Sequence, residues 1–251
     1  MLGQRKAPKA APKKAEIGFV LYQGPSALTG DPIAVIATMS TSNKKTGSMI
    51  QTWIIRADIS PVEASAQKLD NAICGNCPHR QSTGGACYVN IGQAPGAVYR
   101  AYIANRYKAF DPSLHSAYFI GRSVRLGAYG DPAAAPFEAF ETVLKLSNGH
   151  TGYTHQIGHK GFDSRFLTVC QVSADTPKQA IKYQALGAKT FRVALADDDL
   201  LPGEIECKAD SEGLQCIDCG LCDGQAQNIA IAVHGSRSNR FKSNLIASVA
   251  A

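Results

Sequence analysis

The sequence lacks any long apolar segment. No apolar run approaches the roughly 18 residues that a membrane-spanning helix needs. The N-terminus is positively charged, but no apolar stretch follows it as in a secretory signal. These absences predict a cytoplasmic protein with no membrane partner, in a compartment where thiols stay reduced.

Several common catalytic and binding motifs are also missing. The chain has no G-x-x-x-x-G-K-[ST] phosphate loop, no G-x-S-x-G nucleophile elbow and no H-E-x-x-H zinc motif. It also has no helix-turn-helix pattern and no zinc finger with the required histidine spacing. Any chemistry therefore has to come from residues outside these motifs.

Cysteine is the residue type that stands out. A chain of 251 residues can bury a core without covalent cross-links, so its eight cysteines are not needed to hold the fold together. In a reducing compartment, clustered cysteines indicate metal binding or redox chemistry more often than structural disulfides.

The positive charge lies mainly at the two ends of the chain. The formal net charge is +6, and residues 1–14 and 237–242 are rich in lysine and arginine without any acid. We predict a disordered basic leader at 1–15, a single α/β metal-binding domain at 16–235 and a basic C-terminal tail at 236–251. The two basic segments could make salt-sensitive contacts with nucleic acid.

The pattern of strands and helices predicts the fold class. It indicates an N-terminal β-hairpin followed by alternating strands and helices, which favours a mainly parallel sheet. We predict an α/β fold, either a partial or irregular β/α barrel or an open sheet, with cysteine-rich metal loops. The expected strands are 32–40, 49–59, 118–130, 149–156, 166–174, 189–196 and 228–235, and the expected helices are 60–70, 94–110, 136–147 and 176–187.

Four cysteines near the C-terminus have the spacing C-x8-C-x2-C-x2-C; they are Cys207, Cys216, Cys219 and Cys222. Four thiolates suit either an iron–sulfur cluster or a tetrahedral Zn²⁺ ion. The C-x2-C-x2-C run is typical of bacterial ferredoxin loops and favours a 4Fe-4S cluster. Zinc, or thiols without a metal, remain alternatives, and the site could be structural or an electron relay.

Three further cysteines, Cys74, Cys77 and Cys87, have the spacing C-x2-C-x9-C. Three thiolates leave one ligand position open or closed by another residue, such as His79, and an open position is typical of catalytic metals. Iron–sulfur and zinc are both compatible with this set. Cys170 lies alone in an apolar segment, and we interpret it as a buried hydrophobic residue.

Polar residues follow the predicted strands, where sites of α/β proteins gather. Asp131 could instead be a turn residue that binds its own backbone, and His155 could be a base, a metal ligand or a core histidine. Asp175 fits a helix cap. The candidate substrate contacts are Asp131, His155 and Arg125, and the candidate cofactor contacts are Tyr129 and Gln156.

The motifs taken together resemble a known family. The segments "CGNCPHR", "GACYVN", "RLGAYGDPAA", "GHTGYTHQ", "KTFRV" and "CIDCGLCDG" occur in an order similar to that of cysteine-rich proteins encoded by phages and prophages. The resemblance covers roughly residues 33–235, and it implies two metal clusters in a protein of the bacterial host cytoplasm. More distantly, the chain looks like radical SAM enzymes. Their signature is C-x3-C-x2-C, and the different spacing here counts against S-adenosylmethionine as a cofactor.

Two functional hypotheses follow. The first is a phage-type metalloprotein with two cysteine-ligated sites, at least one of them an iron–sulfur cluster, that performs a reductive or radical SAM-like reaction on a small molecule. The second is a zinc-stabilised nucleic-acid-binding or accessory protein of phage replication. A protein whose metal sites are purely structural and whose partner is another protein also fits the sequence.

Overall fold

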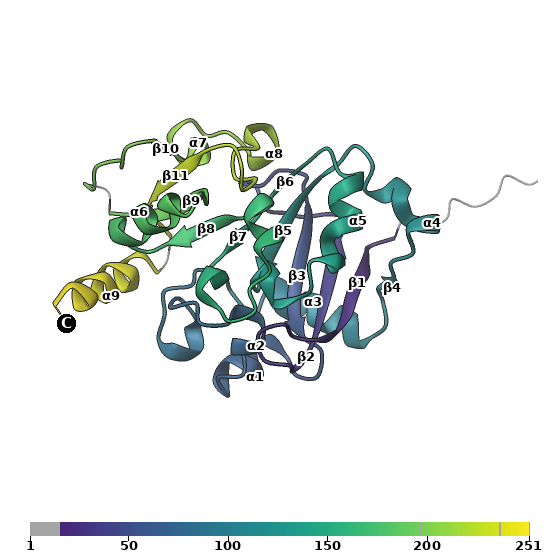
Figure 1. Ribbon diagram of the computed structural model, residues 1–251. Helices are drawn as coiled ribbons and strands as arrows, with labels where there is room; N and C mark the ends of the chain where they lie inside the picture. The colour runs from purple at the N-terminus through teal and green to yellow at the C-terminus, as the bar shows by residue number, and fades with distance from the viewer. Residues whose placement is uncertain (1–15, 196, 236, 251) are drawn as a thin grey trace, which may run out of the picture.

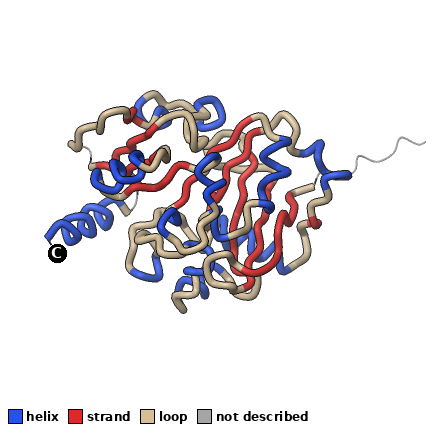
Figure 2. Tube along the Cα trace, in the orientation of Figure 1, coloured by secondary structure: helices blue, strands red, loops and turns tan. Residues whose placement is uncertain are grey.

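The computed structural model describes residues 16–195, 197–235 and 237–250. The predicted basic leader, residues 1–15, lies outside the described residues. Two mostly parallel sheets lie side by side, with helices and loops around them (Figures 1 and 2). The protein therefore has a mixed α/β fold, as the strand and helix pattern predicted.

The first sheet has six strands in the order β4-β1-β2-β3-β5-β6. The pairs β1–β2 and β2–β3 are antiparallel, and the pairs β4–β1, β3–β5 and β5–β6 are parallel. The β2–β3 pair corresponds to the expected hairpin, while β1 and β4 were absent from the prediction. The strands are β1 (Gly18–Pro25), β2 (Pro32–Thr38), β3 (Ile50–Arg56), β4 (Lys108–Ala109), β5 (Ser123–Tyr129) and β6 (Gly149–Thr151).

The second sheet has five parallel strands in the order β10-β11-β9-β8-β7. Gly152 alone separates β6 from β7, so the chain passes from one sheet to the other at this residue. A side chain there would lie 2.6 Å from Cys170 Sγ, so only glycine allows this close approach. The strands are β7 (Tyr153–Thr154), β8 (Gln171–Ala174), β9 (Thr190–Ala194), β10 (Glu204–Glu206) and β11 (Asn228–Ala232).

The longer helices pack on the sheets, with α3 on β3, α5 on β1, and α6 on β8 and β9. Ser60 and Glu63 form the capping box that begins α1. The helices are α1 (Pro61–Ala66), α2 (Asn71–Cys74), α3 (Ala94–Ile103), α4 (Pro112–His115), α5 (Glu138–Leu146), α6 (Pro177–Ala185), α7 (Lys208–Ser211), α8 (Cys216–Cys219) and α9 (Ser238–Ala250).

The expected helices and strands are all shorter in the structure than predicted, and the strand expected at 149–156 is divided into β6 and β7. The helix expected at 94–110 ends at Ile103, because Asn105 adopts a left-handed conformation with φ 52°. The strand expected at 166–174 begins only at Gln171, because residues 164–168 form a 3-10 turn that buries Phe166 against Phe137 and Phe140. A short apolar run does not distinguish these two conformations.

The hydrophobic core lies mainly against the first sheet. It includes buried residues from β2, β3, β5 and α5, such as Ile33, Ile54, Leu126 and Phe140. Cys170 is fully buried in this core, which confirms its interpretation as a hydrophobic residue. Within the described residues, no helix combines the length and apolar character that crossing a membrane requires.

The described part of the predicted basic tail is largely helical. It contains α9, and the first turn of this helix packs against the loop that carries Cys74, Cys77 and Cys87, here called the upstream cysteine loop. Arg237 donates to Gln81 Oε1 at 3.2 Å, and the ring of Phe241 lies 5.5 Å from that of His79. Residues of the segment expected to be a tail therefore make internal contacts.

Candidate metal centre

The carboxyl ends of β5, β7 and β8 meet at one edge of the molecule. Asp131 follows β5, His155 follows β7 and Asp175 follows β8. The loop that carries Cys74, Cys77 and Cys87 lies on the same edge, since Gln156 Nε2 donates to the Cys74 carbonyl at 3.0 Å. The prediction that polar strand ends gather here is confirmed for Asp131, His155 and Gln156.

Backbone bonds fold the upstream cysteine loop back on itself. The N–H of Cys77 donates to the carbonyl of Cys74 at 3.1 Å, and the N–H of Cys87 donates to the carbonyl of His79 at 2.8 Å. A side chain at Gly85 would lie 2.2 Å from the backbone of His79, so the loop needs glycine at that position. These contacts bring the three distant cysteines together.

The three upstream thiols share one partly buried environment. Burial raises the pKa of the Cys74 thiol well above its usual value, and charge on Cys77 and Cys87 raises it further. The pKa of Cys87 is also raised, again mainly by burial. Such thiols remain protonated at neutral pH unless a positive charge, such as that of a metal ion, stabilises the thiolates.

Asp131 organises this edge through its carboxylate. Oδ1 accepts hydrogen bonds from the N–H of Ala133 at 3.0 Å and the hydroxyl of Thr154 at 2.8 Å. Oδ2 accepts from the N–H of His155 at 2.8 Å and from Gln156 Nε2 at 3.3 Å. Asp131 is therefore both the turn residue and a positioning residue for His155.

His79 and His155 converge on the carboxylate of Asp175. Nε2 of His79 lies 2.6 Å from Asp175 Oδ1, and Nε2 of His155 lies 3.5 Å from the same oxygen. Burial alone would raise the pKa of Asp175, but the two imidazoles hold it well below its usual value. Burial lowers the pKa of His155, but the charges of Cys77 and Asp175 outweigh this effect and raise it.

Asp175 takes part in the cap of α6 through its backbone. The Thr176 hydroxyl accepts from the N–H of Gln179, and Gln179 Oε1 accepts from the N–H of Asp175 at 2.8 Å. The carboxylate of Asp175 points instead to the two histidines. Sequence reasoning considered His79 only as a fourth ligand for the cysteines and missed the contact with Asp175, because no local spacing relates them.

Tyr129 lies next to Cys74 and Cys87 of the upstream set. It is 6% exposed, and burial raises its pKa. Together with Cys74, Cys87, Asp70 and other residues it lines a small hollow. Its position beside two thiols is compatible with a contact to a cofactor held there.

The second cysteine set lies along β6. The N–H of Cys216 donates to the Lys45 carbonyl at 2.9 Å, and the N–H of Gly152 donates to the Cys222 carbonyl at 3.0 Å. The N–H of Cys207 donates to the carbonyl of Ala230 in β11 at 2.8 Å. The set is thus fixed to both sheets and to the β2–β3 loop.

The thiols of this set are also electrostatically coupled. Burial raises the pKa of Cys222 to about 12, and charge on Cys207, Cys216 and Cys219 contributes. Tyr153 contacts the Cys222 thiol, and its own pKa is raised by burial. A thiolate at Cys222 therefore also requires a nearby positive charge.

Arg125 lies beside this second set and not with Asp131. Its guanidinium lies 5.7 Å from the ring centre of Tyr153, and Nη2 donates to the Tyr88 hydroxyl at 3.4 Å. Its Nε is buried without a hydrogen-bond partner, and no carboxylate of the described residues lies within 4.0 Å of the guanidinium. Its charge lowers the pKa of the Cys216 thiol, although burial has the larger, opposite effect. Arg125 therefore contacts Tyr88 of the upstream cysteine loop and also acts on the second cysteine set.

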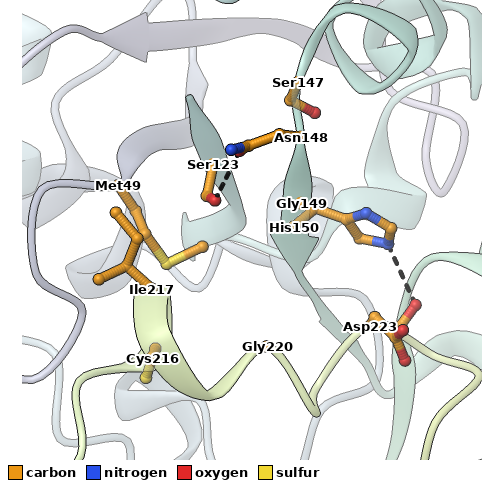
Figure 3. Close-up of a pocket in the computed structure, with 10 residues that line it drawn as sticks. All are labelled: Met49, Ser123, Ser147, Asn148, Gly149, His150, Cys216, Ile217, Gly220 and Asp223. Carbon is orange, nitrogen blue, oxygen red and sulfur yellow. Dashed lines mark hydrogen bonds between the residues drawn. The ribbon is translucent and has the colours of Figure 1, made fainter. Parts of the chain in front are cut away.

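A cavity of about 500 Å³ opens next to Cys216 (Figure 3). Ser123 and Asn148 lie on one side, joined by a 3.1 Å hydrogen bond, and His150 contacts the Asp223 carbonyl at 3.1 Å on the other. Met49 and Ile217 add apolar surface. Of the second cysteine set, Cys216 lines this cavity.

The spacing of the thiols bears on the metal that each set could hold. Zinc–thiolate bonds of about 2.3 Å place the sulfurs of one tetrahedral site about 3.8 Å apart. Among the described residues, which include all the cysteines, neither set has three sulfurs within 4.8 Å of one another. Neither set therefore has the geometry of a formed zinc tetrahedron.

Comparison with known proteins identifies no relative. No protein-family model matches this chain, and no curated protein and no solved structure matches it either.

Proposed function

We propose that the protein is an iron–sulfur protein with two cysteine-ligated clusters that performs a reductive or radical reaction. Cys74, Cys77 and Cys87 would hold the first cluster. The second would be held by Cys207, Cys216, Cys219 and Cys222. The proposal is supported by the C-x2-C-x2-C spacing of Cys216, Cys219 and Cys222, and by the gathering of each set into one group in which charge on one thiol raises the pKa of another.

The two clusters would have different roles. Three cysteines leave one iron of a cubane without a protein thiolate, and this iron could bind a small molecule and exchange an electron with it. Four cysteines close the second cluster, which suits electron relay or structural support. The first set lies at the carboxyl edge, where Asp131 and Gln156 position the surrounding loops.

We further infer that the two sheets are parts of one irregular, partial β/α barrel. The strands β3, β5 and β6 of the first sheet and β7, β8, β9 and β11 of the second follow one another along the chain in this order. The pairs β3–β5, β5–β6, β7–β8, β8–β9 and β9–β11 are parallel. This succession is typical of β/α barrels, whose sites lie at the carboxyl ends of the strands.

Metal analysis of the protein purified without oxygen tests the proposal. Two 4Fe-4S clusters predict about eight irons and about eight sulfides per chain. Replacing Cys74, Cys77 and Cys87 by serine should remove about half of this iron, and replacing the four downstream cysteines should remove the other half. Cys170→Ala is the matched control, and it should leave the iron content unchanged, because Cys170 is buried in the apolar core.

Cyanide binding distinguishes the first cluster, which has an open iron, from the second, which is fully ligated by cysteine. Cyanide added to the reduced protein should alter the electron paramagnetic resonance signal of the first cluster, which has an open iron, and not that of the second. A colourless protein with stoichiometric zinc and no iron would overturn the proposal.

A further inference from the structure

A group of potential metal ligands lies next to the upstream cysteines but contains none of them. Nε2 of His79, Nε2 of His155 and Oδ1 of Asp175 come from three separate loops. One ligand atom from each residue lies within 4.8 Å of those of the other two. Among the described residues, no other three His, Cys, Asp or Glu residues meet this condition. The contact joins the cysteine loop to the carboxyl ends of β7 and β8.

The distances suit a single ion. Metal bonds to nitrogen and oxygen of about 2.0 to 2.2 Å place neighbouring ligand atoms about 3 to 3.5 Å apart. The 3.5 Å between His155 Nε2 and Asp175 Oδ1 already fits this range. The 2.6 Å between His79 Nε2 and the same oxygen is a direct contact and would open by less than about 1 Å.

One of the three ligand atoms lacks a hydrogen-bond partner. Nε2 of His155 is buried, and it faces the Asp175 carboxylate at a distance too long for a well-formed hydrogen bond. A buried polar atom without a partner is costly, and a bound ion would satisfy it. The side chains of His79, His155 and Asp175 are 21%, 20% and 17% exposed, so an ion could still enter from solvent.

The surroundings hold the ligands in place. The backbone N–H of His155 is bonded to Asp131, and the ring of His79 packs against Phe241 of α9. The N–H of Asp175 is bonded to Gln179 Oε1 at 2.8 Å. These contacts fix the backbone positions of His155 and Asp175 and the ring of His79.

We propose that His79, His155 and Asp175 bind a divalent transition-metal ion, Zn²⁺ or Fe²⁺, beside the upstream cysteines. Two imidazoles and one carboxylate are the ligand set of many catalytic zinc and non-haem iron sites, and they leave positions for water or substrate. The site goes beyond the two thiolate clusters and does not depend on them, because none of its ligands is a cysteine.

Cobalt binding to the full-length chain tests this site. We would remove metals with a chelator and titrate Co²⁺ into the variant in which Cys74, Cys77 and Cys87 are serine. One equivalent should bind and give the weak bands of nitrogen and oxygen ligation. Adding His79→Ala or Asp175→Asn should weaken this binding about 100-fold or more, because a direct ligand is lost. His159→Ala is the matched control and should leave the affinity unchanged.

If the serine variant fails to fold, the same substitutions are made in the chain with all its cysteines. His79→Ala and Asp175→Asn should then each remove one bound equivalent of Co²⁺, whereas His159→Ala should remove none. Unchanged cobalt binding in both ligand variants would overturn the site and would identify the three residues as an ion-paired network only. Iron and sulfide content reports separately on the thiolate clusters, so either proposal can fail without the other.

Discussion

The Nε2 atom of His79 lies 2.6 Å from Oδ1 of Asp175, although 96 positions separate the two residues in the chain. His79 belongs to the cysteine loop, which follows β3 of the first sheet, and Asp175 follows β8 of the second. The contact therefore holds the upstream cysteine set against the carboxyl end of the second sheet. A metal ion bound to both residues would therefore link the cysteine loop to the second sheet.

Gly75→Ala should destabilise the cysteine loop strongly. Gly75 has φ 53°, and an added Cβ would lie 2.1 Å from Gln156 Oε1. Gln156 cannot easily move away, because its amide also bonds Cys74 and Asp131. We expect a loss of about 3 to 4 kcal/mol in the free energy of unfolding, measured by chemical denaturation, together with less iron at the upstream set.

Gly84→Ala is the control for this substitution. Gly84 lies in the same loop with φ 79°, but no atom lies within 4 Å of the position of its Cβ. Only the left-handed conformation should penalise alanine here, by about 1 to 2 kcal/mol. Equal losses in the two variants would show that the contact between Gly75 and Gln156 has no special importance.

Asp131→Ala should lower stability and disturb His155. The substitution leaves four hydrogen-bond donors without their acceptor, among them the N–H of His155 and the hydroxyl of Thr154. Because this site is buried, we expect a loss of about 3 to 4 kcal/mol in the free energy of unfolding. Cobalt affinity at the histidine site should fall about 10-fold or more, as is usual when a supporting contact is lost.

Asp111→Ala provides the comparison. Asp111 precedes a proline and accepts from the N–H of Ser113, so it has the same local turn as Asp131. It is exposed, and water can replace its carboxylate. Its substitution should cost clearly less stability and should not change cobalt binding. If both aspartates behaved alike, Asp131 would be a simple turn residue.

Much of the upstream site could be predicted from the sequence, but not all of it. Asp131, His155 and Gln156 each follow a strand, and parallel topology brings such positions to one edge. His79 lies in a loop without periodicity, so nothing in the sequence related it to Asp175. Arg125 was expected with Asp131, but its side chain lies beside the second cysteine set. A strand residue can face either side of a sheet, and its direction depends on a register that the sequence alone does not supply.

The buried ion pair between Arg192 and Glu204 should stabilise the strand that leads to Cys207. Nε and Nη2 of Arg192 donate to the carboxylate, with contacts of 2.7 to 3.1 Å, and both side chains are almost fully buried. Arg192→Met leaves the Glu204 charge buried and unpaired, which should cost about 3 to 5 kcal/mol of stability. Iron should be lost mainly from the downstream set.

The double variant separates packing from charge. Arg192→Met combined with Glu204→Leu removes both charges, so most of the stability should return. Chemical denaturation of the two variants and the parent chain measures this recovery. A double variant as unstable as the single one would indicate that the hydrogen bonds of Arg192, including that to the Asp199 carbonyl, matter more than the charge of Glu204.

Arg125→Gln should make the potential of the second cluster more negative. The guanidinium is buried over Tyr153 without a carboxylate partner among the described residues, and it acts electrostatically on Cys216. A cluster held by four thiolates is negatively charged, so the cluster would supply the negative charge that the Arg125 guanidinium lacks. A positive charge nearby stabilises the reduced form, and losing it should shift the potential by on the order of 50 mV.

Redox titration in the variant with Cys74, Cys77 and Cys87 replaced by serine measures this cluster alone. Arg125→Lys, which keeps the charge, should retain most of the parent potential. If glutamine and lysine gave the same potential, the charge of Arg125 would not act on the cluster, and its role would be limited to packing against Tyr153.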